Sequence, residues 1–206
     1  MLTVVDYGMG NLGSIVNMFR KIGVQAVVTA EPAGIERADK LLLPGVGAFD
    51  TAMTRIKQQG LLDLLNKKAM VEKVPILGVC LGMQLLTDSS EEGSLPGLGW
   101  IPARTLAFKG RLDTGRFKVP HMGWNIVEKH TESPLTAGFG SFEEVRFYFV
   151  HSYFVKCDDD RHSILKTTYG FHFDSGVQNG NIFGAQFHPE KSHTFGMRLF
   201  RNFARL

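Results

Sequence analysis

The first half of the chain alternates short apolar runs with longer amphipathic segments. The apolar runs have the length of strands, whereas the amphipathic segments repeat their apolar positions at helical spacing. This pattern predicts strands over 2–6, 24–29, 40–43 and 74–77, and helices over about 11–22, 32–37 and 50–73, the last broken near Gly60. Strands that alternate with helices are typical of a parallel sheet covered by helices on both faces.

The second half is richer in glycine, proline and β-forming runs. These runs predict strands over 145–155, 163–168, 171–177 and 182–187. We expect them to extend the same sheet in antiparallel fashion, before a final amphipathic helix over 194–205. Because the sequence has no internal repeat, low-complexity tract or linker, we expect residues 1–206 to form a single α/β domain.

Composition excludes several classes of protein. The 206 residues are 44% hydrophobic and 21% charged, as in ordinary soluble globular domains, and a formal net charge of +3 is too small to indicate nucleic-acid binding. No apolar run reaches membrane-spanning length, and the first residues lack the features of a signal peptide. The two cysteines, Cys80 and Cys157, form neither a disulfide framework nor a zinc pattern, so we expect a cytoplasmic protein without a metal or cofactor.

Cys80 lies in a segment with the signature of a nucleophile elbow. The apolar run 74–77 leads into Gly78-Val79-Cys80-Leu81-Gly82 and then into a helix-like stretch, which indicates a strand, a tight turn and a helix. The flanking glycines suit a turn with no room for Cβ atoms. Free N–H groups at the start of the helix would favour a thiolate. A cysteine in an apolar run is more often a core residue, so the hypothesis needs a base nearby.

His188 is the strongest candidate base among the seven histidines. It ends the strand-like run 181–187 and begins His188-Pro189-Glu190. On an extended backbone the residues at positions i and i+2 point to the same side, so Glu190 can hold one ring nitrogen of His188. Cysteine, histidine and an acid form the general set of nucleophile, base and orienting group. A strand-end turn with a solvated glutamate remains the alternative.

An oxyanion formed at Cys80 would need backbone donors. The N–H of Leu81, directly after the cysteine, is one candidate. The loop Pro44-Gly45-Val46-Gly47 is the other, because it follows the strand 40–43 at the edge where open α/β sheets bind ligands. An ordinary glycine-rich turn is the simpler interpretation of this loop.

Six segments together resemble the class I glutamine amidotransferases. They are residues 5–12, 44–47, 78–84, 120–125, 148–153 and 186–190. The segments 120–125 and 148–153 are similar to those of one family in particular, the glutaminase subunits of imidazole glycerol phosphate synthase, an enzyme of histidine biosynthesis. The resemblance covers essentially the whole chain. It implies a flavodoxin-like fold, with a mostly parallel central sheet, helices on both faces and an antiparallel extension.

The resemblance also assigns roles to individual residues. It implies a catalytic triad of Cys80, His188 and Glu190, and an oxyanion site made by Val46, Gly47 and Leu81. The residues that match glutamine-binding positions are Gln84, Glu92, His151 and Ser152. Gln84 could instead be a plain surface residue of its helix, and Glu91 could be the contact in place of Glu92.

The implied reaction is hydrolysis of L-glutamine to glutamate and ammonia through a cysteinyl thioester. Ammonia would then pass to a cyclase subunit, a (β/α)₈ barrel forming a heterodimer with this chain, which makes imidazole glycerol phosphate and AICAR. The residues expected near that interface are Asn11, Trp124, Tyr148 and Lys191. Aromatic side chains are favoured at interfaces, although Trp124 could also be a core residue.

One segment departs from this pattern and leaves the pathway open. Residues 191–197 resemble a branch of the family found beside genes for surface-sugar amination, whose members are thought to supply ammonia to a different synthase. A peptidase-like or deglycase-like enzyme with a cysteine elbow would share the strand-turn-helix signature, as would a non-catalytic binding module of the same fold. A flavodoxin-like nucleotide binder has only a partial phosphate loop, Gly8-Met9-Gly10-Asn11 with Gly13.

Overall fold

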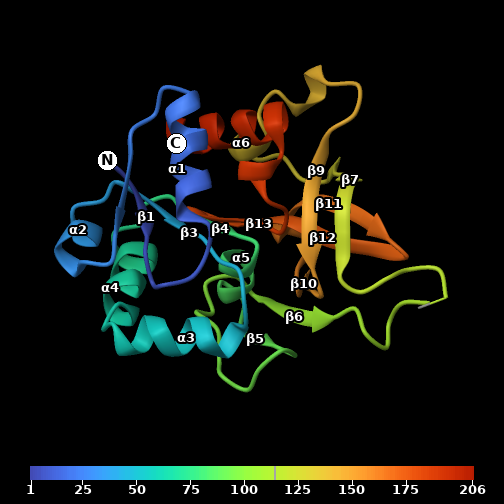
Figure 1. Cartoon of the computed structure of the whole chain (residues 1–206), viewed down its shortest axis with the longest axis horizontal. Helices are drawn as coiled ribbons and strands as arrows, with labels where there is room; N and C mark the ends of the chain where they lie inside the picture. The colour runs from blue at the N-terminus through green and yellow to red at the C-terminus, as the bar shows by residue number, and fades with distance from the viewer. Residues whose placement is uncertain (114) are drawn as a thin grey trace.

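A single large sheet runs through the computed structural model, which describes residues 1–113 and 115–206 (Figure 1). Its 11 strands follow the order β2-β1-β3-β4-β13-β12-β10-β6-β5, with β11 paired to β12 and β8. The strands of this sheet are β1 (Leu2–Val5), β2 (Ala26–Thr29), β3 (Lys40–Leu43), β4 (Ile76–Val79), β5 (Ser89–Ser90), β6 (Ala103–Ala107), β8 (Glu128–Lys129), β10 (Tyr153–Cys157), β11 (Ser163–Tyr169), β12 (Phe171–Asn179) and β13 (Ile182–Ala185). A separate pair is formed by β7 (His121–Ile126) and β9 (Arg146–His151).

The first part of the sheet is parallel, as the sequence predicts. Strands β2, β1, β3, β4 and β13 all run in the same direction. The helices are α1 (Leu12–Lys21), α2 (Pro32–Glu36), α3 (Phe49–Gln58), α4 (Leu62–Asn66), α5 (Leu81–Leu85) and α6 (His193–Arg205). A π-helical turn, Lys67–Val71, follows α4, and short 3₁₀ turns occupy Pro134–Thr136, Phe139–Ser141, Asp160–His162 and Pro189–Lys191. The predicted long helix over 50–73 is thus broken at Gly60, which has φ +67°.

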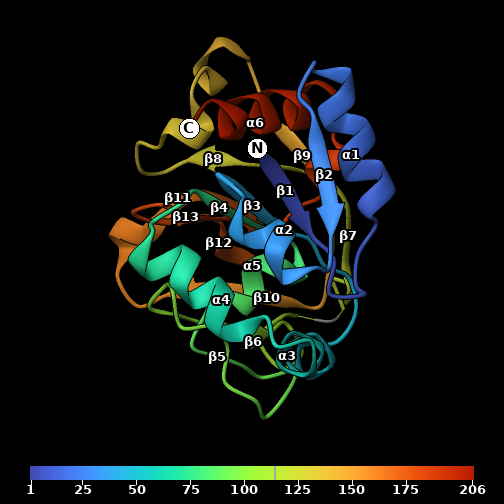
Figure 2. The same ribbon diagram turned by 90° about the vertical axis from the view of Figure 1, so that its left-hand side faces the viewer.

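Helices cover both faces of the parallel strands, because alternate strand residues point to opposite sides. On one face, α1 and α6 pack over Val4 and Leu77, and the rings of Phe19 and Phe200 stack 4.5 Å apart. On the other face, helices α2 to α5 pack over a second core around Leu41. Figure 2 shows this layering, with α1 and α6 on one side of the sheet and α3 and α4 on the other.

The strand predicted over 145–155 is wrong in one respect, because it is two strands in different sheets. Strand β9 pairs with β7, and β10 pairs with β6 in the main sheet. The chain changes sheets at Ser152, whose carbonyl oxygen accepts a hydrogen bond from the N–H of Phe108. In β9 only the alternate residues Phe147, Phe149 and His151 are buried. In β10 the adjacent residues Phe154 and Val155 are both buried, in different cores, because this strand is covered on both faces.

Strands β5, β6, β7 and β8 are absent from the sequence prediction, and β7 has an informative reason. Its apolar residues Met122, Trp124 and Ile126 point to solvent, while His121 is buried on the opposite face. The usual rule for a half-buried strand is therefore reversed, and the hydrophobic pattern does not reveal the strand. Among the described residues, no helix is long and apolar enough to cross a membrane.

Candidate active site

Cys80 lies at a sharp turn between the central strand β4 and helix α5. Its backbone has φ 55° and ψ −110°, a conformation that costs a non-glycine residue about 1–3 kcal/mol. A Cβ at Gly82 would overlap the carbonyl oxygen of Leu43, and one at Gly78 would lie 2.5 Å from the carbonyl oxygen of Gly82. The turn therefore needs glycine on both sides of the cysteine, as expected for a nucleophile elbow. Helix α5 has only five residues, so its contribution to thiolate stability is small.

The neighbouring parallel strand brings His188 to the same edge of the sheet. Residues Val79 and Ala185 are paired in the register of β4 and β13, and the N–H of Cys80 donates to the carbonyl oxygen of Ala185 over 2.7 Å. The segments that follow β4 and β13 both leave the sheet at the carboxyl ends of these strands. Cys80 and His188, which are far apart in the sequence, consequently become neighbours.

His188 is held by Glu190 as the sequence predicts. The distance from Nδ1 of His188 to Oε1 of Glu190 is 2.8 Å, and both side chains are almost completely buried. Burial alone would lower the pKa of His188, but its interactions with the Cys80 sulfur and the Glu190 carboxylate, together with their charges, raise it to about 10. At neutral pH the ring is therefore an imidazolium, which holds a proton that a leaving group could take. Its Nε2 has no hydrogen-bond partner among the described residues.

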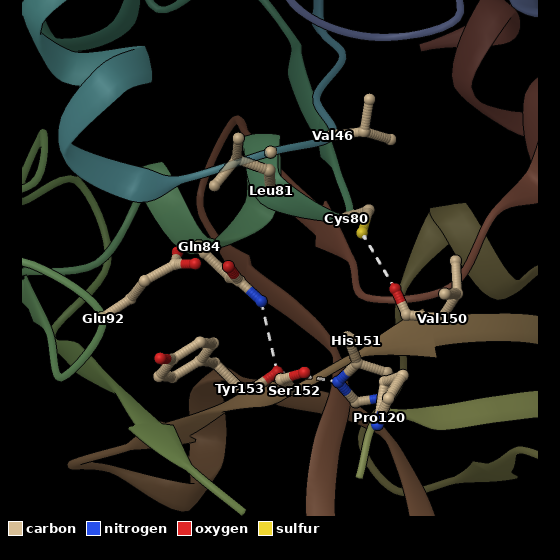
Figure 3. Close-up of a pocket in the computed structure, with 11 residues that line it drawn as sticks. Val46, Cys80, Leu81, Gln84, Glu92, Pro120, Val150, His151, Ser152 and Tyr153 are labelled. Atoms are coloured by element: carbon tan, nitrogen blue, oxygen red, sulfur yellow. Dashed lines mark hydrogen bonds between the residues drawn. The ribbon is translucent and has the colours of Figure 1, made fainter.

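The Cys80 side chain opens into a cavity of about 400 Å³ (Figure 3). A cavity of this size accommodates a small polar metabolite. The residues that line it are Val46, Gly47, Cys80, Leu81, Gln84, Glu92, Pro120, Val150, His151, Ser152 and Tyr153. All four predicted glutamine-binding residues and all three predicted oxyanion residues are in this set. The thiol also lies 3.9 Å from the carbonyl oxygen of Val150, to which it donates.

Glu92, not Glu91, faces the cavity. One oxygen of the Glu92 carboxylate accepts from the N–H of Phe49 at the start of α3, over 2.9 Å. Burial raises the pKa of Glu92, because it disfavours the charged carboxylate. A cationic group bound beside it would offset that cost. Glu91 instead forms a two-point ion pair with Arg111, at 2.7 and 2.8 Å. The structure thus separates the two acids that the sequence leaves as alternatives.

The loop 44–47 approaches the elbow closely. A Cβ at Gly45 would lie 2.8 Å from Cβ of Leu81 and 2.9 Å from the hydroxyl of Tyr7. Tyr7 is completely buried, and its hydroxyl donates to the carbonyl oxygen of Pro44. Burial, together with the charge of nearby Cys80, raises the pKa of Tyr7 far above its usual range, so it remains a neutral donor. Gly47 has φ +114°, a conformation open mainly to glycine.

Sequence reasoning missed the hydrogen-bonded pair of His121 and His151. Nδ1 of His151 lies 2.7 Å from the carbonyl oxygen of Tyr153, so this nitrogen carries the proton. Nε2 of His151 must then accept from Nδ1 of His121, 2.8 Å away, and Nε2 of His121 faces the amide nitrogen of Asn125 at 3.2 Å. Both nitrogens of His151 are therefore used inside the protein. The ring forms part of the cavity wall and has no free nitrogen for a ligand.

Burial among aromatic rings keeps this pair neutral. His121 stacks between Phe149 and Tyr169, with ring centroids 4.8 and 4.0 Å away. Burial lowers the pKa of His121 to about 4. Burial first, and then the charge of His121, lower the pKa of His151 to about 3. The only hint in the sequence is that two histidines interrupt apolar, strand-like segments.

Three of the four residues predicted at an interface lie together on the surface. The ring of Trp124, which is 46% exposed, meets that of Tyr148 edge-on at 6.3 Å and stacks on His193 at 5.6 Å. The Nζ of Lys191 lies 5.7 Å from the centre of the Tyr148 ring. Trp124 is thus not a core residue. Asn11 caps α1 by accepting from the N–H of Ser14 over 3.2 Å, so it has a structural role in any case.

Comparison with known proteins identifies the family of this chain. Residues 3–206 match the family model described as glutamine amidotransferase class-I. The chain belongs to the class I glutamine amidotransferases. Imidazole glycerol phosphate synthase subunit HisH 2 of Methanococcus maripaludis is 54% identical to this amidotransferase over 98% of both chains. Subunit HisH 2 of Pseudomonas aeruginosa is 48% identical and subunit HisH of Bdellovibrio bacteriovorus is 43% identical, each over 100% of both chains.

Solved structures support the fold of this amidotransferase. A crystal structure of a glutamine amidotransferase matches with a TM-score of 0.75 at 17% identity, over 99% of each chain. PurLQS from Thermotoga maritima matches with a TM-score of 0.72 at 19% identity, over 99% of this chain and 97% of that one. The predicted family, fold class and enzyme class are confirmed, and the HisH relatives do not favour the surface-sugar alternative. Among the described residues, no three His, Cys, Asp or Glu side chains form a possible metal site.

Proposed function

We propose that this chain is the glutaminase subunit of an imidazole glycerol phosphate synthase in histidine biosynthesis. It hydrolyses L-glutamine to glutamate and ammonia and passes the ammonia to a cyclase subunit. Full-length relatives that are named as HisH subunits support the pathway. The observation that carries the chemistry is a strained cysteine that lies beside a Glu-paired histidine and opens into a cavity lined by Gln84 and Glu92.

In the first step the Cys80 thiolate attacks the side-chain carbonyl carbon of glutamine. The oxyanion is stabilised by the N–H of Leu81 and by the backbone of the loop at Val46 and Gly47, and one such donor typically contributes about 10²–10³ in rate. As the tetrahedral intermediate collapses, the carbon–nitrogen bond breaks and His188 gives its proton to the departing nitrogen. Ammonia leaves, and a γ-glutamyl thioester remains on Cys80.

In the second step the neutral His188 takes a proton from water, which attacks the thioester. Collapse of the new tetrahedral intermediate expels the Cys80 thiolate and releases glutamate, and His188 is again an imidazolium. Glu190 holds Nδ1 of the ring over 2.8 Å, so that Nε2 faces the sulfur throughout. With a pKa of about 10, His188 is protonated at neutral pH and so holds the proton that the first step needs.

The remaining cavity residues would bind the amino-acid end of glutamine. Glu92 is the carboxylate available for the α-ammonium group. Gln84 donates one amide hydrogen to the carbonyl oxygen of Tyr153 (Figure 3) and the other to Gln186. Its Oε1 is therefore the atom left for the substrate. The hydroxyl of Ser152 is offered to the α-carboxylate. His151 contributes by positioning, because both its nitrogens are occupied.

The partner we propose is a cyclase with a (β/α)₈ barrel. Its docking surface would include the exposed apolar residues Met122, Trp124 and Ile126 of β7, with Tyr148 and Lys191 beside them. Strand β9 pairs with β7 and ends at the cavity, so this surface is continuous with the site. We further propose that residues 1–206 act as one domain and that the enzyme works in the cytoplasm, where its two free cysteines stay reduced.

Glutamate release from L-glutamine would test this function. The chain alone is compared with the chain mixed with a histidine-pathway cyclase subunit and the ribonucleotide substrate of that subunit. Strong stimulation is expected, and Cys80→Ala should abolish the activity whereas Cys157→Ala should retain it. A folded chain with a reactive Cys80 that the cyclase does not stimulate would contradict the pathway.

The interface needs its own test. Trp124→Ala should weaken binding of the cyclase and reduce the stimulation. Val71→Ala is the matched control, because Val71 is an apolar residue that is 75% exposed and lies outside the β7–β9 pair. Equal affinity of the cyclase for the two variants would refute the proposed surface.

A further inference from the structure

Gln186 is a completely buried polar residue close to the triad. It directly follows β13 and precedes His188 by two residues, at a bend in the chain. Nε2 of Gln186 and the ring of His188 both interact with the Cys80 side chain, so both residues face the sulfur. Phe187 points the opposite way and stacks on Phe147, with ring centroids 3.8 Å apart. The sequence therefore directs two polar side chains at one sulfur.

The hydrogen bonds of Gln186 reach the sulfur directly. Its Nε2 donates to Sγ of Cys80 over 3.8 Å. Its Oε1 accepts from Nε2 of Gln84 over 3.1 Å, and Nε2 of Gln84 also donates to the carbonyl oxygen of Tyr153 over 3.2 Å.

The direction of this chain of hydrogen bonds is fixed at one end. The carbonyl oxygen of Tyr153 can only accept, so the amide nitrogen of Gln84 must face it. That nitrogen can only donate, so the atom of Gln186 beside it must be Oε1. Nε2 of Gln186 is then the atom that faces the sulfur. The carbonyl oxygen of Tyr153 thus fixes the orientation of the Gln84 amide, and Gln84 fixes that of Gln186. The result is that Gln186 presents an N–H donor to the Cys80 sulfur.

We propose that Gln186 is a further residue of the catalytic machinery, whose amide N–H stabilises the Cys80 thiolate and whose orientation is set by Gln84. This inference rests on the proposed function, because it takes Cys80 as the nucleophile. A hydrogen bond to an ion is stronger than one to a neutral group, so the donor favours the thiolate over the thiol. Unlike His188, the amide does this at every pH and gives up no proton.

The test is the rate at which iodoacetamide alkylates Cys80 as a function of pH. Gln186→Glu keeps the size of the side chain and can still accept from Gln84, but presents a carboxylate oxygen to the sulfur. The midpoint of the rate profile should move to higher pH by about one unit or more, which lowers the alkylation rate about tenfold at pH values below both midpoints. Gln186→Met, which removes the donor without adding charge, should shift the midpoint in the same direction by less.

Asn202→Leu is the matched control. Asn202 is also a buried amide, and its Nδ2 donates to the carbonyl oxygens of Leu135 and Ala137, away from Cys80. Its loss should lower the melting temperature but leave the pH midpoint of alkylation unchanged. An unchanged midpoint in folded Gln186→Glu would overturn the inference, as would an equal shift in Asn202→Leu.

Failure of the proposed function would look different. In that case the wild-type chain would hydrolyse no glutamine with its cyclase partner, whatever the alkylation profile of the variants. An active wild-type enzyme with identical pH midpoints in wild type and Gln186→Glu would refute the role of Gln186 alone.

Discussion

Lowering the pH from 7 to 5 should destabilise this protein through the buried pair of His121 and His151. In the folded state their pKa values are about 4 and about 3, whereas an unfolded histidine titrates near 6.5. As the pH falls below about 6.5, the unfolded chain binds two protons that the folded protein does not bind. The free energy of unfolding therefore decreases with falling pH, until the pH reaches the folded-state pKa values.

The size of the effect follows from these pKa values. Between pH 7 and 5 each of the two histidines lowers the free energy of unfolding by about 2 kcal/mol. His188 acts in the opposite direction, because its folded pKa of about 10 lies above the unfolded value. The contribution of His188 to the free energy of unfolding is complete only below pH 6.5, and it grows by about 0.8 kcal/mol as the pH falls from 7 to 5. The net loss is about 3 kcal/mol, a large part of the 5–15 kcal/mol that typically stabilises a folded protein.

Urea unfolding at pH 7, 6 and 5, followed by tryptophan fluorescence, measures this loss. Most carboxylates contribute little over this interval, because in the unfolded chain they titrate near pH 4. Glu92, whose folded-state pKa is raised by burial, acts in the direction opposite to His121 and His151. His121→Gln cannot titrate, so it should reduce the loss between pH 7 and 5 by about 2 kcal/mol. His172→Gln is the control, because His172 is exposed and should not alter the loss. A His121→Gln variant that keeps the full wild-type pH dependence would refute the reasoning.

Three further predictions concern the elbow, the cavity and the second cysteine. Gly82→Ala places a Cβ on the carbonyl oxygen of Leu43 and should lower the free energy of unfolding in urea by about 1–3 kcal/mol or more. Gly60→Ala is the control, because its Cβ has open space and only φ +67° opposes it, so it should lower the free energy of unfolding by about 1 kcal/mol. Equal losses would contradict the close packing of the elbow. Glu92→Gln should raise KM for glutamine at least about tenfold in steady-state kinetics. Glu91→Gln should leave KM unchanged and lower the free energy of unfolding by at most about 1 kcal/mol, because it removes only an exposed ion pair. The opposite pattern of KM values would mean that Glu91 binds the substrate. Burial and the nearby Asp174 carboxylate raise the pKa of Cys157 far above its usual range, so iodoacetamide at pH 7 should modify Cys80 alone in the folded enzyme, and a peptide map with equal labelling of both cysteines would disprove this.

The parts of the fold that could be predicted from the sequence are those with local signals. The alternating apolar runs identify the strands around Leu41 and Leu77, and Gly60 correctly divides the long helical stretch. The elbow is readable because its two glycines and its cysteine are contiguous. The pairing of His188 with Glu190 is readable because the two are separated by a single proline, although the structure brings them together through a 3₁₀ turn and not through the extended chain that the sequence predicts.

The parts that could not be predicted depend on contacts between distant segments. Strand β7 has its apolar side outward, so periodicity alone gives it the wrong face. The pairing of His121 with His151 requires the β7–β9 register, which no short pattern encodes. The ion pair between Arg111 and Glu91 and the hydrogen bond between Gln84 and Gln186 are visible only in the folded chain, because both contacts join residues far apart in the sequence.

The position of β13 has a consequence for how the enzyme is made. This strand is among the last elements of the chain, yet it inserts between β4 and β12 in the middle of the sheet. Until residues 182–190 have been synthesised and have entered that gap, β4 and β12 keep open edges that invite pairing with other chains. Non-local pairing of this kind is slow to form. Cys80 therefore gains its base only in the closing stage of folding, so a nascent or truncated chain carries the nucleophile without the means to use it, and no ammonia is released before the sheet is complete.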